Sequence, residues 1–334
     1  MKYALVVNKQ SETGRVNIGD YIQCLAAAQY LPHIDFIVDR ENLNRMDYES
    51  AKIIMNGWFT YHPENWPPNA KLIPLFLSFH LNPTYANKLL SKVQNVEYLK
   101  KHSPIGCRDY TTLNLLQKYH IPSYFSFCLT STLDVNFKRE DKTNSIIFCD
   151  VIYQLQKKTD IGIKITDKNI LKKIRRITAE IIKGTYRKKT IHKLIPKYIY
   201  EQGIHLSQEY PAGKTTEEYF EIARELLEQY ATAKLVITSR IHCAIPCLAL
   251  GTPVLFIPDG INKGKAEISR LRGIVEYLNI LTTYSPRKIK KIFGDVSHIY
   301  TPGSIDWKNP PENPNTHIIL SKELKQKCNN FVTR

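Results

Sequence analysis

Residues 234–257, which read KLVITSRIHCAIPCLALGTPVLFI, predict a strand, a loop, a helix, a turn and a second strand. The β-branched run at residues 234–238 suits a parallel strand that is buried on both faces. Ser239 can cap the helix that follows, and Gly251 can end it just before Pro253 opens the next strand. Units of this kind build parallel sheets covered by helices, so the stretch places the chain in the α/β class.

Arg240 and His242 fall at the junction of this strand and this helix. Ligands of open α/β sheets bind at the carboxyl ends of the strands, and the exposed N–H groups of a helix start attract anions. An arginine beside a titratable imidazole therefore indicates an acidic ligand. An exposed arginine and a locally satisfied histidine are the alternative for two residues taken alone.

The same alternation continues along the chain, whose 334 residues exceed a typical single domain. We expect further strands at residues 2–7, 34–38, 51–55, 72–80, 124–129 and 146–150, and one within 198–210. Helices are expected at residues 21–30, 84–93, 110–119, 215–230, 267–278 and 321–331. The polar and charged residues 136–145 read as a linker. The pattern predicts two doubly wound domains, at 1–140 and 141–334.

The composition is that of a globular protein, with 43% hydrophobic and 23% charged residues. No uninterrupted apolar run is long enough to span a bilayer, and the first residues do not read as a signal peptide. The seven cysteines are scattered and include no CxxC pair. We therefore expect a cytoplasmic protein with reduced thiols packed in its cores, and neither disulfides nor a zinc site.

The net charge of +16 is concentrated in residues 157–197, where fourteen Lys and Arg stand against three acidic residues. Within this segment isoleucines recur at helical spacing and basic residues are interleaved with them: Ile170, Ile174, Ile177 and Ile181, with Lys172, Lys173, Arg175 and Arg176. Such a basic helix suits either an outer helix packed on a sheet or adsorption to an anionic membrane surface. No zinc-finger, heptad or ribonucleoprotein pattern is present, so we expect no nucleic-acid partner.

Four short segments, taken in order, resemble the polysaccharide pyruvyl transferase family. They are NIGD at 17–20, NG at 56–57, SPIGCRD at 103–109, and SRIH at 239–242 with the GTP that follows its Ala-rich helix. The resemblance implies two Rossmann-like domains that face each other across a cleft, the GT-B arrangement. It also implies transfer of the enolpyruvyl unit of phosphoenolpyruvate onto two hydroxyls of a sugar, in a cell-surface polysaccharide or its lipid-linked precursor.

The resemblance suggests roles for particular side chains. Arg240 and Arg108 lie at strand-to-helix junctions of different domains and would bind the carboxylate and phosphate of the donor. His242 would protonate the enol carbon. Asp20 would accept a hydroxyl proton, although helix capping explains this residue equally well. Further substrate contacts are expected from four residues of the matching segments: Asn17, Gly19, Asn56 and Ser239.

One segment departs from the family pattern. Many members carry a glycine-rich turn where this chain has SFHLNP at 78–83. His80 would then either contact the acceptor or be a strand-end histidine bonded to backbone. Both interpretations stay open at this point.

No metal and no cofactor are expected, because HExxH, DxD and cysteine-cluster motifs are absent from the sequence. The expected partners are phosphoenolpyruvate and a saccharide acceptor. A lipid-linked acceptor would add the inner face of the membrane, with the protein bound peripherally.

Two other functions fit the same architecture. A GT-B-type glycosyltransferase that uses a nucleotide sugar would want an acidic residue for the ribose, and the expected loop has none. A non-catalytic glycan- or phosphate-binding relative would not need both Arg240 and His242.

Overall fold

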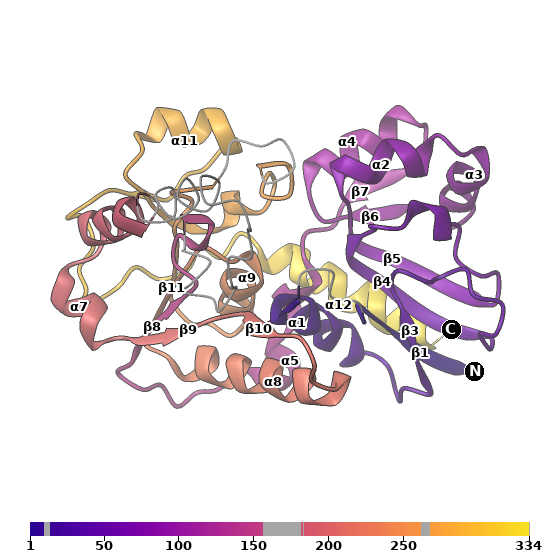
Figure 1. Cartoon of the computed structure of the whole chain (residues 1–334), viewed down its shortest axis with the longest axis horizontal. Coiled ribbons are helices and arrows are strands. Elements are labelled where there is room, and N and C mark those ends of the chain that lie inside the picture. The colour runs from indigo at the N-terminus through magenta and orange to yellow at the C-terminus, as the bar shows by residue number, and fades with distance from the viewer. Residues whose placement is uncertain (10–13, 156–181, 183, 262–267, 334) are drawn as a thin grey trace, which may run out of the picture.

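The computed structural model describes residues 1–9, 14–155, 182, 184–261 and 268–333, and contains two six-stranded parallel sheets (Figure 1). The order in the first sheet is β3 (Phe36–Asp39), β1 (Lys2–Val7), β4 (Ala51–Phe59), β5 (Leu72–Leu81), β6 (Ile105–Cys107) and β7 (Ser123–Phe125). The order in the second is β14 (Ile299–Tyr300), β13 (Asn279–Leu281), β12 (Val254–Phe256), β11 (Leu235–Thr238), β8 (Ile146–Cys149) and β9 (Ile204–Leu206). This confirms the predicted α/β class with two Rossmann-like domains in a GT-B-like arrangement.

The two sheets repeat one topology. In each, the first strand lies between the second and the third, as β1 lies between β3 and β4, and β8 between β9 and β11. The chain therefore reverses direction across the sheet beside its first strand. In doubly wound sheets, ligands bind outside the carboxyl ends of the strands at such a switch point.

Helices cover the sheets and join the domains. They are α1 (Ile18–Ala28), α2 (Pro83–Leu90), α3 (Val93–Lys101), α4 (Tyr110–Lys118), α5 (Asp134–Phe137), α7 (Lys197–Gln202), α8 (Thr216–Thr232), α9 (Ile241–Ala249), α11 (Pro286–Phe293) and α12 (Ile318–Thr333). Short 3₁₀ turns are η1 (Pro63–Asn65), η2 (Leu129–Thr132), η3 (Tyr153–Leu155) and η4 (Val275–Tyr277). A capping box precedes α8, with Thr215 and Glu218 bonded reciprocally.

The domain interface is a packed core. Helix α1 of the first domain lies against α8 of the second, and the ring of Tyr21 contacts those of Tyr219 and Phe220 at centroid distances of 5.2 and 5.1 Å. One hydrophobic cluster runs from β1 through α1 to α9 and β12 without a break. The two domains therefore share one hydrophobic core, whose burial holds them together.

A two-stranded antiparallel ribbon crosses between the domains at the switch points. Strand β2 (Arg15–Asn17), just before α1, pairs with β10 (Glu209–Pro211), which follows β9. The N–H of Ile18 also donates to the carbonyl of Gln208 at 2.7 Å. The ribbon thus fixes the start of α1 against the second domain.

The C-terminal helix α12 returns to the first domain (Figure 1). The Tyr3 hydroxyl donates to the carbonyl of Val332 at 3.1 Å, and Lys52 Nζ donates to that of Phe331 at 2.9 Å. The chain ends beside β1, where it began. The domain limits 1–140 and 141–334 stay a prediction.

One predicted helix is confirmed only in its first part, as α2, and another is wrong. Residues 84–93 do not form one helix, because Lys92 takes an extended conformation and separates α2 from α3. Residues 270–278 form turns and η4 instead of the expected helix, because Gly273 has a φ of +87°. The basic helix expected at 170–181 lies outside the described residues.

All seven cysteines are buried and free of disulfides, which confirms the expected core thiols. Within the part of the chain that the structure describes, no helix is both long and apolar enough to cross a membrane.

Candidate functional site

A cavity of about 420 Å³ lies between the domains at the carboxyl ends of both sheets. Its lining carries many more cationic than acidic side chains among the described residues. These are Lys9, Arg15, Arg40, Arg108, Lys214, Arg240 and Arg270, against Asp20 and Glu209. A concave surface of one sign focuses its field, so the cavity favours an anionic ligand.

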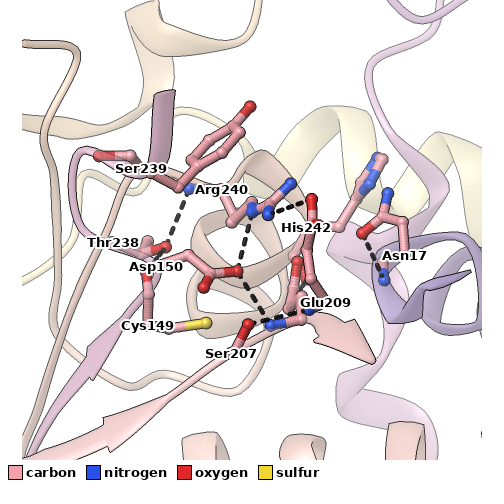
Figure 2. Close-up of polar contacts among 12 residues, drawn as sticks. Asn17, Cys149, Asp150, Ser207, Glu209, Thr238, Ser239, Arg240 and His242 are labelled. Atoms are coloured by element: carbon pink, nitrogen blue, oxygen red, sulfur yellow. Dashed lines mark hydrogen bonds and ion pairs between the residues drawn. The ribbon is translucent and has the colours of Figure 1, made fainter. Parts of the chain in front are cut away.

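Arg240 follows β11 and is held by two carboxylates. Its Nε lies 2.9 Å from Oδ2 of Asp150, and its Nη2 lies 2.8 Å from Oε1 of Glu209 (Figure 2). Its Cζ lies 3.6 Å from the ring centroid of Tyr153. Burial opposes the charge, but Asp150, Tyr153 and Glu209 outweigh it and raise the pKa of Arg240. Much of its charge is therefore already balanced by the protein.

Ser239 is not the helix cap that the sequence predicts. The N-cap of α9 is Arg240, which makes no side-chain cap bond. Ser239 Oγ instead donates to the carbonyl of Ile257 at 2.6 Å and accepts from the N–H of Ile152 at 2.8 Å. It thus links the chain segments that follow β8, β11 and β12, and it is not among the residues that line the cavity.

His242 owes its position to a proline four residues further on. Pro246 has no N–H for the carbonyl of His242, and its ring crowds that carbonyl. His242 accordingly has non-helical φ and ψ of −84° and 15° inside α9. Gln208 Nε2 donates to the freed carbonyl at 2.9 Å. This opened first turn places the imidazole in the cavity lining, beside Asn17 (Figure 2).

The imidazole of His242 is surrounded by positive charge. Burial lowers its pKa well below 6.5, and Arg108, Arg270 and Arg240 lower it further. Nε2 lies 3.4 Å from Nη1 of Arg108, and because a guanidinium only donates, Nε2 accepts and the proton stays on Nδ1. At pH 7 the ring is neutral in these surroundings.

Arg108 is the opposite of Arg240. It follows β6 and is 1% exposed, yet no carboxylate of the described residues lies within 4.0 Å of its guanidinium. Its Nη1 donates to Oε1 of Gln23 at 3.3 Å, and its Nε has no hydrogen-bond partner in the described part of the chain. Burial lowers its pKa. A buried charge without a partner is costly, and an anionic ligand would supply one.

His80 is bonded to a carboxylate and not to backbone. Its Nδ1 lies 2.5 Å from Oδ2 of Asp109 and 3.2 Å from Oγ1 of Thr112. Burial lowers the pKa of His80. For Asp109 burial acts in the opposite sense, but His80, Arg108 and the N–H of Thr112 outweigh it and lower the pKa. The pair is thus a neutral imidazole beside an ionised carboxylate.

The model of the polysaccharide pyruvyl transferase family matches residues 17–259, well over half of the chain. The chain belongs to this family. No curated protein matches it. The matched span begins at the cap of α1 and ends after β12, so it includes Arg108, Arg240 and both histidines of the pyruvyl transferase cavity.

At the start of α1, the cap differs from the prediction. Asn17 is the N-cap and accepts from the N–H of Gly19 at 3.2 Å, whereas Asp20 lies in the first turn. Asp20 lines the cavity, accepts from Gln23 Nε2 at 3.2 Å and lies 3.6 Å from Nη1 of Arg40. A Cβ on Gly19 would lie 3.1 Å from Nδ1 of His242, so this glycine allows the histidine to approach.

The Asn56–Gly57 pair lies behind the cavity in this pyruvyl transferase. Asn56 Nδ2 donates to the carbonyl of Gln23 at 2.9 Å, and Asn56 is not part of the lining. A Cβ on Gly57 would lie 2.8 Å from Gln23 Oε1, the atom that accepts from Arg108. The pair therefore positions Gln23, the residue that accepts a hydrogen bond from Arg108.

Several residues of the cavity escaped the sequence analysis. Asp150, which holds Arg240 but does not itself line the cavity, directly follows β8 at the switch point, a position that could have drawn attention. Glu209 and Arg270 lie in a ribbon and a turn that carry no comparable signal. Trp58 and Tyr61, with ring centroids 4.2 Å apart, form an aromatic wall at the end of β4.

Proposed function

We propose that this member of the family transfers the enolpyruvyl unit of phosphoenolpyruvate onto two hydroxyls of one sugar, forming a cyclic pyruvate ketal and releasing phosphate. The single observation that carries the choice of donor is Arg108, a buried guanidinium in the cavity to which the described residues offer no carboxylate partner. Phosphoenolpyruvate is a compact polyanion whose phosphate and carboxylate both suit guanidinium donors.

In this proposal the donor binds among the arginines of both domains. Arg108 would take the larger share of its charge. Arg240 would remain a second contact, with part of its charge already balanced by Asp150 and Glu209. The negative ligand would offset the three arginines that lower the pKa of His242, so donor binding would bring a proton to the imidazole.

The protonated His242 would then begin the reaction. It gives its proton to the methylene carbon, and the first sugar hydroxyl adds to the neighbouring carbon, which bears the carboxylate and the phosphate. The bond from this carbon to the phosphate oxygen breaks with its electron pair on phosphate, and the second hydroxyl adds in its place. The two hydroxyl protons balance the one gained by the methyl group and the one carried on hydrogen phosphate.

The test is ligand-induced thermal stabilisation with phosphoenolpyruvate and with a panel of nucleotide sugars. We expect phosphoenolpyruvate to raise the melting temperature, and we expect His242→Gln to keep this rise while losing phosphate release. Stabilisation by a nucleotide sugar alone would refute the proposal and favour a glycosyltransferase. Stabilisation by phosphoenolpyruvate that leads to no phosphate release with any acceptor would favour a non-catalytic relative.

We further propose that the acceptor belongs to a cell-surface polysaccharide or its lipid-linked precursor, and that the reaction takes place in the cytoplasm without a metal or cofactor. Turnover should then persist in excess chelator. A lipid-linked acceptor would bring the basic protein to an anionic membrane surface, as its charge of +16 supports. Co-sedimentation with anionic but not with neutral vesicles would be expected, and equal binding to both would contradict it.

A further inference from the structure

The His80–Asp109 pair has its proton in a defined place. Asp109 Oδ1 accepts from the N–H of Thr112 as the cap of α4, which leaves Oδ2 for His80 at 2.5 Å. An ionised carboxylate only accepts, so Nδ1 of His80 carries the proton and donates it. Nε2 is therefore the bare nitrogen. Since Nδ1 is turned to Asp109, Nε2 is the one left to face the cavity that His80 lines.

This arrangement differs from that of a histidine that only supports the fold. Both members are almost wholly buried, at 1% and 0% exposure of their side chains. The carboxylate is fixed by its second bond to the start of α4, so the ring cannot turn without losing its bond to a fixed acceptor. A neutral imidazole oriented by a buried carboxylate is the arrangement that general bases use.

The aromatic side chains beside His80 suit a ring-shaped substrate. Trp58 is its register neighbour on β4, and both side chains line the cavity together with Tyr61. Aromatic faces pack well against the C–H groups of a pyranose. The charged groups around His80 are Asp109 at the cap of α4, Arg108 just after β6 and Arg270 from the turn before η4, and the titratable group is His242 from α9. The acceptor side thus adjoins the donor side.

We propose that His80 is the catalytic base that takes the proton of the first attacking sugar hydroxyl, with Asp109 as its positioning residue and the sugar against Trp58 and Tyr61. This inference rests on the proposed function. As the hydroxyl oxygen forms its bond to the donor carbon, its proton passes to Nε2 of His80. The same proton later leaves on the departing phosphate, which restores the neutral ring.

The first experiment measures phosphate release from phosphoenolpyruvate with methyl gluco-, galacto- and mannopyranosides and with water alone. His80→Gln should lower kcat by about 10²- to 10⁴-fold and leave the thermal shift with phosphoenolpyruvate intact. His33→Gln is the matched control, because His33 also pairs with a carboxylate, Asp35 at 3.2 Å, but is 59% exposed and outside the cavity. It should behave as wild type.

The second variant, Asp109→Asn, separates catalysis from folding. Asparagine caps a helix as well as aspartate does, so α4 should persist. Without the negative charge the imidazolium loses its partner, and the acid limb of the pH–kcat profile should move to lower pH while kcat falls about tenfold or more. If the His80–Asp109 pair had only a structural role, Asp109→Asn would change stability and leave the acid limb of the pH–kcat profile in place.

Nitrogen NMR of histidine-labelled protein tests the assignment without an acceptor. The signal lost in His80→Gln should report a protonated Nδ1 and a bare Nε2 near pH 7, and Asp109→Asn should alter it. The opposite tautomer, or wild-type kcat in His80→Gln, would overturn the assignment while phosphoenolpyruvate binding stood. Loss of binding in His80→Gln would make it a donor contact. A wild-type protein that phosphoenolpyruvate does not stabilise would overturn the proposed function itself.

Discussion

Arg108 and Arg240 have the same sequence setting but different electrostatic surroundings. Each follows a parallel strand, precedes a helix and lines the cavity between the domains. Arg240 pairs with two carboxylates at 2.9 and 2.8 Å, whereas Arg108 has none within ion-pair distance in the described chain. A strand-end arginine is available to a substrate only where the fold has not already balanced its charge. We therefore propose that Arg108 chiefly binds the donor and that Arg240 chiefly supports the site.

The largest expected effect is that of Arg108→Met on donor binding. The loss of a buried charged contact costs about 2–5 kcal/mol, so we expect the Kd for phosphoenolpyruvate to rise at least about 30-fold. Thermal stability should stay the same or rise, because an unpaired buried charge is replaced by an apolar side chain. Calorimetric titration and a melting curve measure the two effects.

Arg45→Met is the matched control for that experiment. Arg45 is 57% exposed, pairs with Asp47 and lies outside the cavity. Its replacement should change neither affinity nor stability beyond a few tenths of a kcal/mol. If Arg108→Met bound phosphoenolpyruvate as this control does, the cavity would not bind its donor through Arg108.

The second effect concerns stability, and Arg240→Met should show it. Its removal leaves the carboxylate of Asp150, whose side chain is 2% exposed, buried without its ion pair. Breaking a buried pair from one side costs about 3–5 kcal/mol, which urea unfolding would measure. Adding Asp150→Asn should restore part of the loss, because the remaining group is then neutral. A stable Arg240→Met that bound donor more weakly than Arg108→Met would reverse the comparison.

The positions of the site residues were largely predictable from local sequence, whereas their electrostatic partners were not, for a physical reason. The strand-end positions of Arg108, Arg240 and His242 follow from apolar runs and caps, which are local properties. What distinguishes the two arginines is not local, because Asp150 and Glu209 lie 90 and 31 residues from Arg240. No spacing rule brings such residues together; only the repeated topology of the sheets does.

The caps and the kink were predictable to different degrees. Aspartate suits a helix cap, which makes Asp20 a candidate for the cap of α1, but Asn17 suits it as well and stands where β2 is fixed by the second domain. The bend at His242 was within reach of the sequence, since Pro246 lies four residues beyond it. The bond between His80 and Asp109 was not, because it joins a strand to a helix in three dimensions.

The smallest expected effect is a pH dependence of stability, which arises from His242 beside the two arginines. The pKa of His242 is well below 6.5 in the folded protein, so between about pH 6.5 and 5.5 the unfolded chain binds a proton that the folded chain does not. Stability must then fall as pH falls through this window, with a slope that approaches about 1.4 kcal/mol per pH unit for one such group. His242→Gln should remove that part of the fall in melting temperature, and the fall due to His80 should remain.

Phosphoenolpyruvate, by offsetting the charge of Arg108, should reduce the slope of stability against pH in wild type and not in Arg108→Met. If stability had the same slope against pH in wild type and in His242→Gln, the arginines would not keep this imidazole neutral. His242 could then bind a proton without a bound anion.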